Sequence, residues 1–158
     1  IDLAKSIGIK PTHIDSHEGA LFFDQSIFKT YLDIGEENQL PVFVPKEVAV
    51  HFDKSFPKPE NVVIVENMYM ALPNLEFKDW SDYYVNVIEN LKPGLNEIIV
   101  HLGYDDKEMQ QITIEHPNYG SKWRNLDMDV VSSESFKQAI EKNNIKLVTW
   151  REIQKVIY

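Results

Sequence analysis

The segment 11–17, Pro-Thr-His-Ile-Asp-Ser-His, holds the densest group of metal-ligand side chains in the sequence. Alternate residues of a β-strand point to the same face, so a strand here would direct His13, Asp15 and His17 to one side. Two imidazoles and a carboxylate on one face suit a divalent metal ion. The alternative is that His13 and Asp15 hydrogen-bond each other and nearby backbone at a strand end. Spacing alone leaves both interpretations open.

A second candidate is His101, which directly follows the apolar stretch 97–100. This stretch predicts a strand, and a His at the carboxyl end of a strand is well placed to act as a general acid or as a metal ligand. Imidazole suits both roles because it changes protonation near neutral pH. The alternative is a surface His without a chemical role.

The third candidate group is Trp123, Arg124 and Asp127, which lie in the stretch 102–128. This stretch has no clear periodicity and is long for a connection, so it predicts a functional loop. The indole can stack on a sugar ring, and the guanidinium can orient a carboxylate. The group is therefore a candidate for substrate binding, with a structural Arg–Asp pair as the alternative.

The remaining ligand-type residues are expected to have no role in chemistry. His51 and His116 have no partner pattern and are expected to be exposed loop residues. The run 105–108, Asp-Asp-Lys-Glu, is interpreted as the solvated start of a helix and not as a metal site.

Strands and helices that could position these residues alternate along the chain. Short apolar, β-branched runs predict strands, and apolar residues three or four apart predict helices. The alternation indicates an α/β fold with a mainly parallel sheet, either open or part of a barrel. In such folds, active sites lie at the carboxyl ends of the strands. The expected strands are 9–16, 40–44, 61–65, 97–100 and 145–149, and the expected helices are a turn ending at Gly8, one capped by Asp24, 79–91, one capped by Ser132 or Ser133, and 151–158.

Composition narrows the class of protein. The 158 residues, 43% of them hydrophobic, predict one soluble domain with a packed core. The net charge of -9 argues against nucleic-acid and anionic-membrane partners. No apolar run approaches the roughly 20 residues of a membrane-spanning helix. Because the sequence contains no Cys, any metal must be held by His, Asp or Glu.

The segment 11–17 resembles the signature of the YdjC-like deacetylases, a family related to chitooligosaccharide deacetylases. The stretch 98–101, Ile-Ile-Val-His, resembles a later strand of the family whose His is commonly followed by Pro, whereas Leu102 follows here. The family's signature often continues with further His residues, whereas Glu18 to Phe22 contains none. Arg124 with Asp127 and Met128, the stretch 132–140 and the stretch 145–153 resemble the family's C-terminal end.

The resemblance implies a distorted (β/α) barrel with a divalent metal held by one Asp and two His. His17 matches the second His ligand, His13 and Asp15 match supporting positions, and His101 matches the candidate general acid. Zn, Mn, Co and Ni suit such ligands, and Mg is tolerated. The implied substrate is an N-acetylated sugar, whose acetamide is hydrolysed by metal-activated water.

In the family, the Asp-Asp motif and the first His ligand lie on strands that come before the position of Ile1, so this sequence does not contain them. We therefore expect residues 1–158 to be the C-terminal portion of a single barrel domain, inactive by itself. A cytoplasmic location is favoured, and a homo-oligomer is allowed. Two rival functions remain, a non-catalytic carbohydrate-binding domain and a metal hydrolase of another amide or ester.

Overall fold

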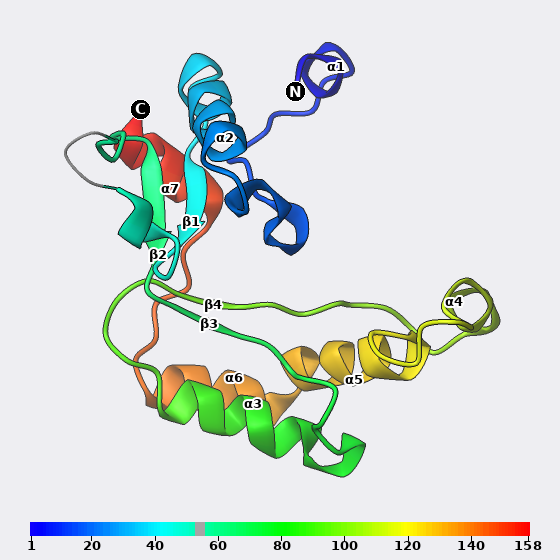
Figure 1. Cartoon of the computed structure of the whole chain (residues 1–158). Coiled ribbons are helices and arrows are strands. Elements are labelled where there is room, and N and C mark those ends of the chain that lie inside the picture. Colours follow the sequence, from blue (N-terminus) through cyan, green and yellow to red (C-terminus); the bar gives the residue numbers. More distant parts are fainter. Residues whose placement is uncertain (53–55) are drawn as a thin grey trace. The chain divides into compact units, whose positions relative to one another are not determined.

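The computed structural model describes residues 1–52 and 56–158, which divide into two compact units. Unit 1 comprises Ile1–Asn67 and Leu147–Tyr158, and unit 2 comprises Met68–Lys146 (Figure 1). Helices and short strands occur together, which confirms the predicted α/β class. The distorted barrel, and a single domain built on it, remain predictions.

A two-stranded parallel sheet forms the centre of unit 1. Strand β1 (Val42–Pro45) pairs with β2 (Val62–Val65), and Ile14 adds an isolated parallel bridge to Val42. Both strands are apolar and β-branched, as buried parallel strands require. The strands predicted at 40–44 and 61–65, and their parallel direction, are confirmed. The other elements of unit 1 are α1 (Asp2–Ser6), the 3₁₀ helices η1 (His17–Phe22) and η2 (Ala49–His51), α2 (Gln25–Glu37) and α7 (Trp150–Ile157).

Helix α2 covers this sheet and supplies much of the core of unit 1. Asp24 caps the helix, because its carboxylate accepts hydrogen bonds from two amides of the first turn. Phe28, Tyr31 and Leu32 are buried against β1 and β2, as their helical spacing predicts. Ile27 of the same helix is 46% exposed.

Two of the predicted strands do not form. Residues 9–16 make only the single bridge at Ile14, and residues 145–149 are not in a strand. Leu147 is 74% exposed, so its apolar run lacks the neighbours that would make it a buried strand. The helix predicted after this run is confirmed as α7, where Thr149 and Glu152 form a capping box. Gly8, with φ 88°, ends the first helical segment as predicted.

Three helices pack around one apolar cluster in unit 2. Helices α3 (Trp80–Glu89), α5 (Ser121–Ser132) and α6 (Glu134–Lys142) contact one another pairwise (Figure 1). The predicted helices at 79–91 and after Ser133 are confirmed, and the Ser133 hydroxyl accepts the amide of Phe136. The buried cluster comprises Ala71, Trp80, Tyr84, Ile88, Trp123, Val130, Phe136 and Ala139.

The second sheet pairs β3 (Asn67–Tyr69) with β4 (Asn96–Ile98). Strand β4 ends two residues earlier than predicted, although the amide of Ile99 still donates to the carbonyl of Tyr69. Ile98 and Val100 pack against the apolar cluster of unit 2. The residue that follows them is His101, so the sheet and the helices together set its position.

The loop predicted at 102–128 is instead largely helical. It contains helix α4 (Lys107–Ile112) and most of α5. Elsewhere in the unit, the 3₁₀ helix η3 (Phe77–Asp79) precedes α3. Asp106 caps α4 by accepting the amide of Met109, which confirms the interpretation of this run as a helix start. Periodicity was hidden in α5 because a charged residue, Asp127, occupies a position on its buried face.

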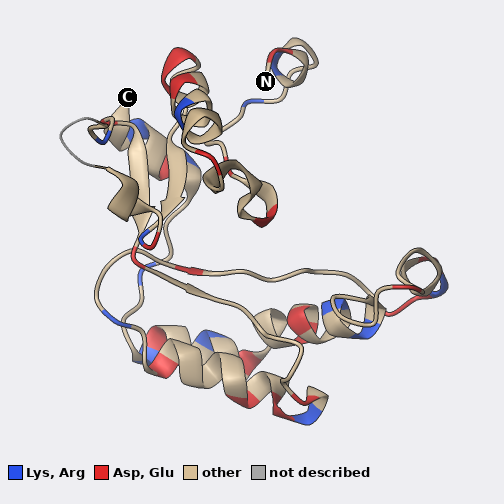
Figure 2. Cartoon of the chain, viewed as in Figure 1, with Lys and Arg blue, Asp and Glu red and all other residues tan. Residues whose placement is uncertain are grey.

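Acidic and basic side chains are interspersed along the helices of both units (Figure 2). None of the helices in the described part of the chain has the length and apolar composition needed to cross a bilayer.

Candidate functional site

His101 lies in unit 2, directly after the strand-forming segment that contains β4. Its backbone N–H donates to Oδ2 of Asp127 at 2.8 Å, and its ring lies 5.1 Å from that of Tyr119. The side chain is half-buried. Its Nδ1 atom is buried without a hydrogen-bond partner among the described residues. The backbone of His101 is therefore anchored, and one nitrogen of its ring is buried and unpaired among the described residues.

Asp127 is the carboxylate that organises this region. It is fully buried, and its Oδ1 accepts hydrogen bonds from Trp80 Nε1 at 2.8 Å and from the Tyr84 hydroxyl at 3.0 Å. With the His101 amide on Oδ2, three donors satisfy one buried carboxylate. Burial raises the pKa of Tyr84, and the negative charge of Asp127 raises it further. The network ties the end of β4 to helices α3 and α5.

Tyr119 covers the same region and was not singled out from the sequence. Tyr119 has a backbone φ of 62°, which is uncommon for a non-glycine residue. Its carbonyl oxygen accepts a hydrogen bond from Arg124 Nε at 2.8 Å. The Tyr119 ring lies 4.4 Å from that of Trp123 as well as against His101. The available sequence signal was the pair Tyr119-Gly120 directly before α5, which alone does not specify a site.

Trp123 and Asp127 lie in the interior, whereas Arg124 is half-buried. Trp123 is 3% exposed, and its Nε1 lacks a hydrogen-bond partner among the described residues. Arg124 bonds the Tyr119 carbonyl, while Asp127 bonds three other groups. These contacts give each side chain a structural role, and substrate binding by the three residues stays a prediction.

His17 lies in unit 1, at the start of η1, and its side chain is exposed. The residue before it, Ser16, is buried, and its hydroxyl accepts the amide of Leu21 at 2.9 Å. Glu18 and Gly19 both have positive φ, so the chain turns sharply after His17. An extended strand through residue 17 is therefore wrong, and metal ligation by His17 stays a prediction.

His13 and Asp15 lie in different environments. The His13 ring stacks on Trp150 of α7, with centroids 4.1 Å apart and planes at 6°, and its Nδ1 lies 3.0 Å from the Thr12 hydroxyl. Burial lowers the pKa of His13, and the charge of Asp15 opposes that shift. Asp15 itself is exposed. Their supporting role at a metal stays a prediction, and Trp150 is the partner of His13 that sequence reasoning missed.

Residues 1–52 and 56–158 contain no group of three or more His, Asp or Glu side chains arranged to hold a metal ion. His17 and His101 belong to different units, and each is described within its own. The combination of these two residues in one site is a prediction. His51 and His116 are exposed as expected, although His51 ends the 3₁₀ helix η2 and does not lie in a loop.

Comparison with known proteins gives consistent results. The family model for YdjC-like proteins matches residues 1–142. A carbohydrate deacetylase of Clostridium beijerinckii is 24% identical over 150 residues, which cover 94% of this chain and 56% of that protein. A crystal structure from Enterococcus faecalis V583, described as a putative cellobiose-phosphate cleavage protein, superposes with a TM-score of 0.65 at 19% identity, covering 95% of this chain and 55% of that one.

The chain thus spans about half the length of the relatives that it matches. The structural likeness, at 19% identity, bears on the fold alone. The family match covers most of the chain and includes both the segment 11–17 and His101. The chain belongs to the YdjC-like protein family.

Proposed function

We propose that this chain is part of a metal-dependent hydrolase that removes acetyl groups from N-acetylated sugars or oligosaccharides. The family and the carbohydrate deacetylase among its relatives support this function. The observation that carries the proposal is the anchoring of His101, whose backbone is held by buried Asp127 while Nδ1 has no described partner.

In the proposed reaction, water attacks the acetyl carbonyl, the C–N bond breaks, and the products are acetate and the free amine of the sugar. An amine is a poor leaving group unless its nitrogen is protonated. His101 would deliver that proton, a step for which positioned imidazoles are well suited. The hydrogen bond from its backbone to Asp127 would hold the ring at a constant place during proton transfer.

A divalent metal remains part of the proposal. His17 offers one exposed imidazole, but the described residues do not assemble a full set of ligands. They therefore do not by themselves fit a metal ion. We propose that further ligands belong to the part of the relatives' length that this chain does not span.

The test is acetate release from chitooligosaccharides by the full protein and its His101→Gln variant. General acid catalysis contributes about 10²–10⁴-fold, so kcat should fall by that order. His116→Gln, which changes an exposed His of unit 2, is the matched control and should leave kcat unchanged. Full activity of His101→Gln would refute the assigned role. Sugar binding without acetate release by the unmodified protein would favour a carbohydrate-binding domain.

A further inference from the structure

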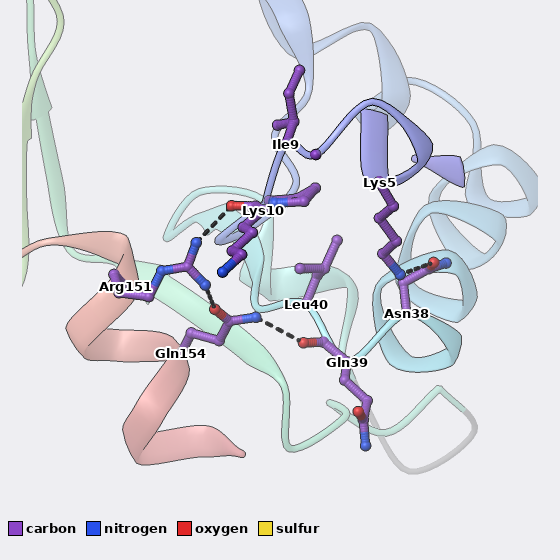
Figure 3. Close-up of a pocket in the computed structure, with 10 residues that line it drawn as sticks. Lys5, Ile9, Lys10, Asn38, Gln39, Leu40, Arg151 and Gln154 are labelled. Atoms are coloured by element: carbon purple, nitrogen blue, oxygen red, sulfur yellow. Dashed lines mark hydrogen bonds between the residues drawn. The ribbon is translucent and has the colours of Figure 1, made fainter. Parts of the chain in front are cut away.

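Unit 1 contains a cavity of about 430 Å³ bordered by Lys5, Lys10 and Arg151 (Figure 3). Cavities of roughly 300–1,000 Å³ are typical for small-molecule ligands. None of the described residues that line it is acidic. Glu36 and Glu37 precede the lining residue Asn38 in sequence but do not border the cavity.

The three cations have no carboxylate partner within the described residues. Lys5 Nζ donates to the amide oxygen of Asn38 at 2.9 Å. Arg151 donates to the side-chain oxygen of Gln154 at 2.6 Å and to the carbonyl oxygen of Lys10. Lys5 and Arg151 are thus bonded to neutral groups, in a chain whose net charge is -9. Such an arrangement leaves the charges available to an anion.

Hydrogen bonds also fix the wall of the cavity in advance. Gln154, which orients Arg151, donates from its own amide to the carbonyl of Gln39 at 3.1 Å (Figure 3). These contacts join α7 to the segment before β1 and to the segment around Lys10. The two described bonds of Arg151 use two of the five N–H groups of a guanidinium, so further donors remain for a ligand. A preordered wall lowers the entropy lost on binding.

The bridge at Ile14 separates this cavity from His17 along the chain. Ile14 and Val42 form an isolated parallel bridge. Lys10 and Gln39 precede these two residues, whereas His17 follows Ile14, so the cavity lies before the bridge along the chain and His17 lies after it. A ligand in the cavity would therefore not lie beside His17.

We propose that this cavity is a binding site for a phosphoryl group, either as inorganic phosphate or as the phosphate of a small phosphorylated metabolite. A phosphate dianion matches a cavity bordered by one guanidinium and two ammonium groups better than a neutral ligand does. The proposal goes beyond the deacetylase function and does not depend on it, because binding can be measured without catalysis.

The experiment is calorimetric titration of the protein with inorganic phosphate, with glucose 6-phosphate and with uncharged glucose. Both phosphates should bind and glucose should not, and binding should weaken as salt is raised. Tighter binding of glucose 6-phosphate would assign a phosphorylated metabolite, and equal binding would assign the phosphoryl group alone. Absence of heat with both phosphates, while the protein is folded, would overturn the proposal.

Variants locate the site. Lys10→Gln should weaken phosphate binding by about three- to tenfold, and Lys10→Arg should retain it, because the second change keeps the charge. The side chain of Lys10 is exposed, and Arg151 contacts only its carbonyl oxygen, so neither change removes that bond. Lys29→Gln is the matched control, since Lys29 lies in the same unit and pairs with Asp33. An equal loss of binding in Lys10→Gln and Lys29→Gln would contradict this location.

Discussion

Asp127→Asn is the most informative change in unit 2, because it removes one charge and little volume. The carboxylate accepts from Trp80 and Tyr84 on one oxygen and from the amide of His101 on the other. An Asn side chain has one carbonyl oxygen and one NH₂ group. Its NH₂ group must therefore face either the donors of Trp80 and Tyr84 or the amide of His101. At least one buried donor then loses its partner.

The magnitude follows from the number of unpaired groups. One buried donor without a partner costs about 1–3 kcal/mol, and the new NH₂ group adds a similar cost where it faces another donor. Removal of a buried charge offsets part of this, because the desolvation cost of the carboxylate disappears. We expect a net loss of about 2–4 kcal/mol, a large share of the roughly 5–15 kcal/mol that stabilises a typical domain.

The assay is urea denaturation followed by tryptophan fluorescence, since Trp80 and Trp123 both report on unit 2. The indole N–H resonance of Trp80 should also shift, because that group donates to Asp127. Asp129→Asn is the control, because Asp129 is exposed on the same helix, and it should change stability by less than about 0.5 kcal/mol. If Asp127→Asn is as stable as the unmodified protein, the network does not hold β4 and α5 together as described.

Two predictions concern unit 1. Burial lowers the pKa of His13 below its ordinary value of 6.5, so the unfolded state binds a proton more readily than the folded state does. The free energy of unfolding should therefore fall as pH decreases from about 6.5 through the lower pKa of the folded state. Thermal melts of the protein and of His13→Phe across this range check it, and an unchanged pH dependence in the variant would contradict it. Gly35→Ala should lower stability by about 1–3 kcal/mol, because the added Cβ would lie 2.1 Å from Val42 Cγ2, where α2 approaches β1. A thermal midpoint equal to or above that of the unmodified protein would show that α2 moves away at little cost.

Local sequence patterns were sufficient for the elements whose stability is decided nearby. Asp24 and Ser133 cap helices with hydrogen bonds to amides two or three residues away, so their sequence positions already define the helix starts. The apolar runs of β1 and β2 likewise have few other ways to be buried. The same type of run failed at 145–149, where no neighbouring strand covers Leu147.

The sequence by itself determined the family resemblance, the α/β class and the candidates His13, His17 and His101. Only the tertiary structure decided what surrounds them. The hydrogen bond between His101 and Asp127 joins residues 26 positions apart, and the stack of His13 on Trp150 joins opposite parts of the chain. Such contacts depend on how separate elements pack, and no local spacing encodes that packing. For the same reason, the three cations at the cavity of unit 1 came together only when residues near both ends of the chain were placed side by side.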